Sequence, residues 1–478
     1  MPITLLYLNA NAHLMFERRE FEGYWWTPES EDRKVPGTIE YDPDEGITLQ
    51  LLTTLTEDGN IPSADSAARR YDRILGKSTD NDDITLINCI VSNVSGIGGT
   101  QTEQYQANQL LIGHCFPDSI EFSRLQVKSE LIDAWAERAA TSFDSSIFDR
   151  ADGEEPVKGK VGDTFEIKAE TPETLETEID RGTIKLKHNI STNLRRRGGG
   201  EITDRCFFEL DFEPDTVGRD ILLDYVKKIE DFILLALGEE CWAEELIGIG
   251  TDNDTEIKIL YPPQGSPKAA SKIHPYKTNF ILPDISDNYD TVMENWFTIS
   301  DKYSQALNLY FSTRYNNRMY VNNEFFTLVQ TIEVYHRRNE KFEEVYLNSD
   351  DFKDYYDDLC DTIRSDFDNS FKQHLKNGTF EYANEYSLAK RMRELVRDID
   401  DILEEIPLEF ESNIRPIVNG RNNLTHEGDA GTSTNKLYEF TLVLKALFET
   451  FILLDIDISK DHVQERLSQR YAELSSDV

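Results

Sequence analysis

The segment NGRNNLTHEGDAG, residues 419–431, places Arg421, Asn422 and His426 within six positions. Imidazole is the side chain that most readily exchanges protons near neutral pH, and a neighbouring guanidinium can stabilise negative charge. These three residues, called the motif residues below, could therefore form an active site. They could equally be ordinary polar residues of a loop. The spacing alone does not decide between the two, so the surrounding elements have to.

The residues around this segment predict that the motif lies at the end of a helix. A GDAG break follows it and precedes a long apolar helix over 440–456. Positions four apart share a helical face, so Asn422 could hydrogen-bond to His426 and orient its imidazole. The long side chain of Arg421, one step round the helix, could reach the same cleft. The apolar residues with helical spacing are Phe410, Ile414, Ile417, Val418 and Leu424.

Two other patterns are interpreted as chance matches. Arg181 and His188 have a similar spacing, but they lie on an alternating, strand-like segment with Gly182 directly after the arginine. An acid-x-Lys pattern typical of metal-dependent DNA nucleases occurs twice, as chance predicts in an acid-rich sequence. Its two copies are Asp163, Glu166 and Lys168, and Asp254, Glu256 and Lys258.

The composition favours a soluble protein of a salty cytosol. The 478 residues include 90 acidic and 50 basic side chains, which gives a formal net charge of −40 spread along the whole chain. Five scattered cysteines form no C-x-x-C pattern, so we expect neither a disulfide framework nor a zinc module. We expect no membrane span, because the apolar stretch 440–456 is too short to cross a bilayer, and no signal peptide, because no basic segment precedes the apolar run at the amino terminus. We also expect a cytoplasmic protein without a cofactor or bound metal.

The periodicity of apolar residues divides the chain into two halves. Short alternating runs predict strands up to about residue 290, with a hairpin over 37–52 and a helix over 218–238 that ends at Gly238. Helical spacing then predicts an up-and-down bundle. We therefore expect an α+β protein, with a β-rich domain over 1–290 and an all-α domain over 291–478. The predicted bundle helices besides the motif helix cover 291–312, 322–342, 350–371, 385–406 and 434–456, and the last of these is expected to end the bundle.

The helical half resembles the HEPN superfamily, and in particular the ApeA-like HEPN domain of antiphage abortive-infection proteins. RNNLTH, residues 421–426, is similar to the Arg-Asn-x-x-x-His motif of the superfamily. FFTLVQTIEVYHRR, residues 325–338, is similar to a helix of the family that ends in a Tyr-His-Arg run. Residues 21–52 look like the start of the ApeA amino-terminal domain.

This resemblance implies a metal-independent endoribonuclease of antiphage abortive infection that cuts cellular RNA, with tRNA as the expected target. His426 would transfer the proton of the 2′-hydroxyl or of the leaving oxygen, and Arg421 would stabilise the charge of the transition state. The expected products are a 2′,3′-cyclic phosphate and a 5′-hydroxyl. The resemblance also implies a homodimer whose two motifs face one cleft. The β-rich half would sense a phage-derived trigger or restrain the nuclease.

Several further residues have two interpretations each. Glu333 matches an acidic position of the family and could orient Arg421, or it could form a structural ion pair. The positive charges available for RNA could equally be solvated surface; they are Arg337, Arg338, Arg391, Arg393, Arg397 and the segment 194–200. The rival hypothesis for the whole chain is a non-catalytic HEPN dimerisation scaffold with a ligand-sensing β domain.

Overall fold

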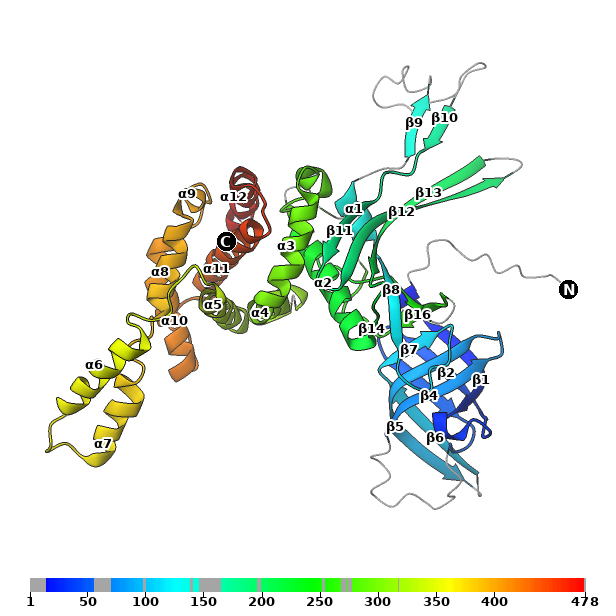
Figure 1. Cartoon of the computed structure of the whole chain (residues 1–478), viewed down its shortest axis with the longest axis horizontal. Helices are drawn as coiled ribbons and strands as arrows, with labels where there is room; N and C mark the ends of the chain where they lie inside the picture. The colour runs from blue at the N-terminus through cyan, green and yellow to red at the C-terminus, as the bar shows by residue number, and fades with distance from the viewer. Residues whose placement is uncertain are drawn as a thin grey trace. The chain divides into compact units, whose positions relative to one another are not determined.

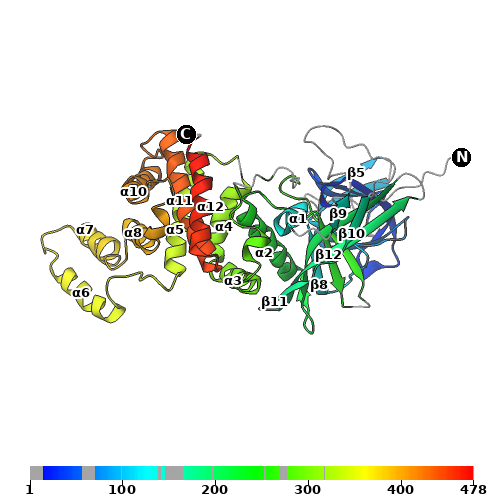
Figure 2. The same ribbon diagram turned by 90° about the horizontal axis from the view of Figure 1, so that it is seen from above.

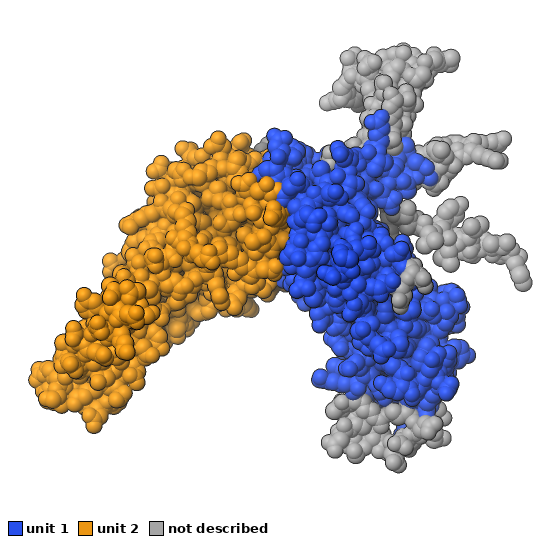
Figure 3. Space-filling model, viewed as in Figure 1, with its two compact units in different colours: residues 1–275, 280–290 blue, residues 276–279, 291–478 orange. Residues whose placement is uncertain are grey.

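The computed structural model describes residues 14–55, 70–97, 100–137, 141–145, 165–195, 199–251, 254–267, 273, 277–316 and 318–476. The chain divides into two compact units, coloured separately in Figure 3. Unit 1 consists of Met1–Pro275 with Phe280–Asp290, and unit 2 of Tyr276–Asn279 with Thr291–Val478. Unit 1 is β-rich and unit 2 is helical (Figure 1), so the predicted α+β fold class is confirmed.

Six of the described strands of unit 1 close into a barrel. They pair antiparallel in the order β5-β4-β1-β2-β3-β6, and β6 pairs back onto β5. Large side chains such as Trp25, Tyr41 and Tyr105 are fully buried in its core. The strands are β1 (Arg19–Trp26), β2 (Val35–Asp42), β3 (Gly46–Leu51), β4 (Arg70–Ser78), β5 (Asp83–Ile97) and β6 (Thr100–Ala107).

The predicted hairpin over 37–52 is the β2–β3 pair. Asp42 Oδ1 accepts the backbone N–H groups of Asp44 and Glu45 at 2.9 and 3.2 Å and so closes the turn. Gly46 then enters β3 with a φ of 102°, a conformation that glycine tolerates. The turn chemistry read from the sequence therefore sets the register of this pair.

The sheet continues beyond the barrel through β7 (Gln109–Ile112), which pairs with β5. Two helices, α1 (Glu130–Ala136) and α2 (Arg219–Leu237), pack on this extension. α2 ends as predicted, with Gly238 at a φ of 71° and its N–H bonded to Leu234 O. The remaining strands of the extension are, in order, β16 (Glu256–Leu260), β15 (Glu245–Gly250), β8 (Glu121–Lys128), β13 (Gly199–Asp211), β12 (Gly182–Arg195) and β11 (Leu175–Ile179), with β14 (Val217–Gly218) beside β8. β9 (Thr141–Ser145) and β10 (Phe165–Ala169) form a separate ribbon.

Unit 2 is built around α11 (Thr434–Asp455), against which α5 (Val321–Arg338), α10 (Phe410–His426) and α12 (Lys460–Ser476) pack (Figure 2). Ser433 caps α11 by accepting the N–H of Lys436 at 3.2 Å. α4 (Ser304–Tyr315) packs on α5, and α8 (Leu388–Asp398) packs on both α5 and α10. The prediction of a buried helix over 440–456 is confirmed. Among the described residues, every helix is too short or too polar to cross a membrane.

Three predicted helices are interrupted, and the prediction of the last helix is wrong. The 291–312 segment forms α3 (Tyr289–Lys302) and α4, and the 385–406 segment forms α8 and α9 (Asp400–Leu403). The 350–371 segment is broken because Asp368 caps a new helix by accepting the N–H of Ser370 at 2.7 Å. A further helix, α12, follows α11. It is not predicted from the sequence because it is largely polar, and its fully buried side chains form only a narrow stripe: Val463, Leu467 and Tyr471.

Between α5 and α8 the chain forms an arm of α6 (Ser349–Asp361), α7 (Asn369–His374) and a π-helical turn, η8 (Leu375–Phe380). None of the residues of these three elements is buried. At the base of the arm, Tyr386 N–H bonds to Glu344 O and Tyr346 N–H bonds to Asn384 O, both at 3.0 Å. The chain therefore leaves unit 2 at residues 344–346 and returns at residues 384–386. These two segments are bonded to each other and are called the neck of the arm below.

Candidate active site

The motif residues lie in the last two turns of α10, as the apolar spacing predicts. Phe410 and Ile417 are buried and fix the inward face of this helix. The helix ends where Glu427 N–H bonds to Asn423 O at 2.7 Å, and Gly428 follows with a φ of 76°. Pattern and break together thus place the motif at a helix end.

Arg421 and Asn422 are joined directly. Arg421 is half-buried, and its Nη1 donates a hydrogen bond to Asn422 Oδ1 at 3.2 Å. Asn422 itself is exposed. The arginine side chain therefore extends round the helix toward the exposed face, which is the reach expected from its length.

His426 is the last residue of α10, and its side chain is exposed. Asn422 shares a face with it, being four residues away, but the carboxamide oxygen of Asn422 accepts its hydrogen bond from Arg421. Within the described part of the chain, no hydrogen bond or ion pair reaches the imidazole. Arg421 lies five residues from His426 and so about 140° away round the helix. Within a single copy of the chain, Arg421 is therefore bonded to Asn422, and the imidazole of His426 is exposed to solvent.

A cavity of about 320 Å³ in unit 2 lies at the start of α10 rather than at its end. Glu409, the N-cap of α10, and Asn413 of α10 line it together with Lys436 and Glu439 of α11. None of the motif residues lines this space. The cleft that the motif was expected to share is therefore not this cavity.

Glu333 forms a structural ion pair, the second of its two interpretations. Its carboxylate pairs with Arg337 of the same helix at 3.4 Å. Arg337 also pairs with Glu385 at 2.9 Å and with Glu344 at 3.9 Å. Glu333 and Arg337 thus belong to an ion-pair cluster beside the neck of the arm, and Arg421 bonds to Asn422 instead.

The prediction that Arg391 could contact RNA is wrong, because this residue is completely buried. Its guanidinium donates to Tyr386 O at 3.1 Å and to Glu344 O at 3.3 Å, one on each of the two segments that form the neck. It also donates to Nδ1 of the buried His336 at 3.1 Å, whose Nε2 faces Glu394 at 3.1 Å. Since arginine only donates, His336 Nδ1 must carry a lone pair, and burial lowers the pKa of this histidine.

The other proposed positive charges differ in their availability. Arg338 and Arg397 are exposed, and Arg393 is half-buried. In the segment 194–200, residues 196–198 lie outside the described residues and the side chains of the others are not described. α8, which carries Arg393 and Arg397, packs on the motif helix α10.

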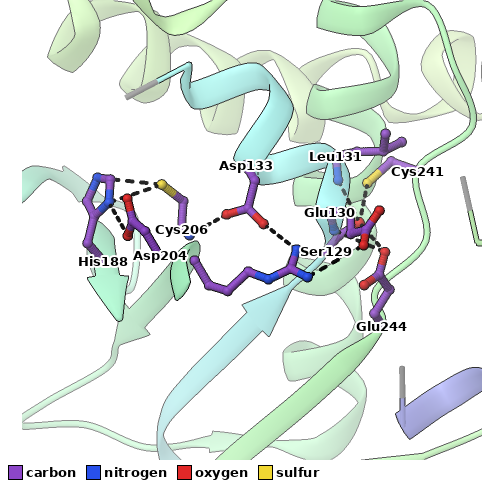
Figure 4. A network of polar contacts seen from close by, with 10 residues as sticks. Ser129, Glu130, Leu131, Asp133, His188, Asp204, Cys206, Cys241 and Glu244 are labelled. Carbon is purple, nitrogen blue, oxygen red and sulfur yellow. Dashed lines mark hydrogen bonds and ion pairs between the residues drawn. The ribbon is translucent and has the colours of Figure 1, made fainter. Parts of the chain in front are cut away.

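The second Arg-x-His match is structural, as interpreted. Arg181 pairs with Asp180 at 3.6 Å. The buried His188 bonds to Asp204 at 3.1 Å beside Cys206 in the network of Figure 4. The Cys206 sulfur lies 3.4 Å from Nδ1 and 3.5 Å from Nε2, so it cannot lie along the lone pair of either nitrogen. Cysteine, histidine and aspartate meet here, but not in the line that nucleophilic catalysis needs.

The acid-x-Lys patterns do not assemble a metal site in the described part of the chain. Asp254 forms an ion pair with Arg124 at 2.7 Å, while Glu256 and Lys258 lie on β16. Glu166 and Lys168 lie on β10, and Asp163 is outside the described residues. No group of three or more His, Cys, Asp or Glu side chains among the described residues is arranged to hold a metal ion.

Two family models match the chain. The model of ApeA N-terminal domain 1 matches residues 20–296, and the model of the Apea-like HEPN domain matches residues 326–462. The second match includes the whole of α8, α10 and α11, and with them the motif residues. No curated protein and no solved structure matches the chain.

Proposed function

We propose, from the premise that the chain belongs to the ApeA family of HEPN proteins, that it is an endoribonuclease which cuts cellular RNA in antiphage defence. An ApeA-like HEPN domain suggests a nuclease of antiphage defence. HEPN domains also generally act as dimers and bind RNA. The residues to which we assign the cleavage are Arg421, Asn422 and His426.

The observation that carries this proposal is the placement of the motif at an exposed helix end. His426 is open to a bound substrate, and Arg421 is already bonded to Asn422, which shares the face of His426. An open imidazole can transfer protons, and a guanidinium on its flank can stabilise charge on a phosphate. When the 2′-hydroxyl of RNA attacks the phosphate, the reaction requires these two contributions.

In the proposed reaction the 2′-hydroxyl attacks the adjacent phosphorus, and the 5′-oxygen of the next nucleotide leaves. His426 transfers the proton of the attacking or of the leaving oxygen, and Arg421 stabilises the extra negative charge on the phosphate. Asn422 holds the guanidinium. The products are a 2′,3′-cyclic phosphate and a 5′-hydroxyl. The nucleophile belongs to the RNA and the proton acceptor to the protein, so the reaction needs no metal ion.

We place the complete site between two copies of the chain. In one copy His426 lies on the surface at the end of α10, and Arg421 lies about 140° away round the same helix. A second α10 across a two-fold axis would cover this end and bring the groups of both helices to one phosphate. The proposed active species is therefore a homodimer through unit 2.

The remaining elements of the proposal concern the target and its setting. We propose tRNA as the substrate and the cytoplasm of a salt-adapted cell as the place of action, in keeping with the net charge of −40. Unit 1 is proposed to sense a phage-derived trigger or to restrain the nuclease.

The test is cleavage of total RNA in multimolar KCl with EDTA by the wild type and by Arg421→Ala and His426→Ala. We expect each variant to lose about 10²- to 10⁴-fold in rate while remaining folded. Arg364→Ala is the matched control, because this arginine is 70% exposed and pairs with Asp366. Undiminished cleavage by both motif variants would end the assignment, and cleavage that EDTA abolishes would point to a metal-dependent nuclease.

A second candidate function is the non-catalytic scaffold, in which the α10 end only mediates dimerisation and unit 1 binds a ligand. The open His426 is compatible with this alternative, since an exposed side chain can serve an interface as well as a reaction. The scaffold would be favoured if RNA stays intact both when it is incubated with the resting protein and in cells that carry the trigger.

A further inference from the structure

We propose that Arg415 binds a phosphate of the RNA a few nucleotides from the scissile bond and so positions the substrate along α10. The inference rests on the proposed ribonuclease function and extends its site by a residue that the Arg-x-x-x-x-His pattern does not contain. Arg415 is named here as a positioning residue, because it acts on the part of the RNA that does not react.

Helical geometry places Arg415 on the face of α10 that carries Asn422 and His426, two of the motif residues. It precedes Asn422 by seven residues and His426 by eleven, which are spacings of a single helical face. All three side chains are exposed, whereas Phe410 and Ile417 point into unit 2. At 1.5 Å per residue, Arg415 lies about 10 Å along the axis from Asn422 and about 16 Å from His426. A phosphate held by Arg415 is thus a few nucleotides from the bond that is cut.

Arg415 keeps its charge available although the chain has 90 acidic residues against 50 basic ones. Among the described residues, no ion pair or hydrogen bond reaches its guanidinium. The nearest acid on its face, Glu411, is approached by Arg393 of α8 at 3.9 Å. Asp429, beyond the end of α10, accepts the N–H of Gly431 at 3.4 Å. Glu411 is therefore approached by an arginine of α8 and not by Arg415.

α8 extends the positive charge sideways. Arg397 is exposed and lies one turn after Arg393, so both occupy the same face of α8. The pair between Arg393 and Glu411 shows that this face borders the face of Arg415. The contact with Glu411 places Arg393 beside the first turn of α10, so the positive charge of α8 adjoins Arg415 rather than His426. Local positive charge is what a polyanion needs from a protein whose overall charge repels it.

A guanidinium is suited to this role, because its planar donors match two phosphate oxygens at once and read no base. Its loss should weaken RNA binding equally for all sequences and leave the chemical step intact. KM should rise while kcat stays constant, because Arg415 is too far from His426 to touch the reacting atoms.

The experiment measures cleavage kinetics and the binding of a fluorescein-labelled single-stranded RNA by Arg415→Ala, Arg415→Lys and Arg415→Glu. Binding is measured in the His426→Ala background, which prevents cleavage, with Arg364→Ala as the control for an exposed arginine elsewhere. We expect Arg415→Ala to raise KM and Kd about tenfold, Arg415→Lys to be intermediate and Arg415→Glu to be the weakest binder. The slope of log Kd against log salt should fall by about 0.7, the value for one lost phosphate contact on a single strand.

The outcomes separate this inference from the proposed reaction. Wild-type protein that binds RNA through Arg415 without cutting it would remove the proposed chemistry and retain the phosphate contact. Unchanged RNA affinity of Arg415→Ala, equal to that of Arg364→Ala, would overturn the inference whether or not RNA is cut. A fall in kcat with unchanged KM would also overturn it, because Arg415 would then act on the reaction itself.

Discussion

Glu449 offers the sharpest test of how unit 2 is held together. It lies in the middle of α11 with no exposed surface, and it is engaged from three sides. Tyr310 and Tyr471 donate their hydroxyls to it, the latter at 2.8 Å, and Arg470 approaches it at 3.3 Å. Burial by itself would raise the pKa of Glu449, but Arg470 and the tyrosine hydroxyls hold it below its usual value.

Replacing Glu449 by Leu should destabilise unit 2 by about 3–5 kcal/mol. The change removes the carboxylate that faces Arg470 and takes the acceptor from two buried tyrosine hydroxyls. Arg470 retains its hydrogen bond to Asn279 at 2.9 Å, which does not neutralise its charge. The measurement is urea unfolding at neutral pH in constant KCl, followed by tryptophan fluorescence, for wild type and variant.

The double variant Glu449→Leu with Arg470→Met is the matched control. Because it removes both charges, it should recover at least about 1 kcal/mol relative to Glu449→Leu alone. A single variant within 1 kcal/mol of wild type, or strictly additive effects in the double variant, would refute the view that this ion pair is a coupled part of the core. Since the folded pKa of Glu449 is lowered, its contribution should be present above the unfolded pKa of 4.5 and be lost as pH falls through the folded value.

Two further predictions concern other buried groups. Burial raises the pKa of Glu230 in α2 to about 8, so the carboxyl should destabilise the folded protein increasingly as pH rises from 4.5 to 8. Glu230→Gln keeps the acceptor for Ala243 N–H. The variant should lose this pH dependence of stability and have a higher midpoint of thermal unfolding than the wild type at pH 9. An identical pH slope in variant and wild type would contradict this. Arg391→Met removes the donors to Tyr386 O and Glu344 O and should open the neck, which limited proteolysis would detect as faster cutting within 344–386. Cutting at the wild-type rate would show that the backbone bonds of the neck suffice without Arg391.

The sequence predicts best those elements whose signals are local. The β2–β3 hairpin follows from the Asp-Pro-Asp-Glu-Gly turn, and the end of α2 follows from Gly238. The position of the motif at the end of α10 follows from apolar spacing and the GDAG break. In each case a few neighbouring residues determine the conformation, so no knowledge of distant contacts is needed.

The sequence does not predict features that depend on distant partners. Barrel closure requires β6 to pair with β5, which no short pattern specifies. Arg391 has the sequence context of a solvated helix, yet it is buried because the neck of the arm supplies carbonyl acceptors around it. The face shared by Arg415 and His426 could have been found by counting eleven positions back from the histidine. The hydrogen bond expected between Asn422 and His426 is not formed between these two described residues, because four-residue spacing permits a contact without requiring it.

The strand β5 belongs to two hydrogen-bonded systems at once. Its residues 84–87 pair with β7, which leads into the helix-covered extension, and its residues 90–97 pair with β6, which closes the barrel. At this strand the two parts of unit 1 share one backbone instead of a flexible linker. A ligand that shifted the barrel would therefore displace the extended sheet directly, and the two could not melt independently there.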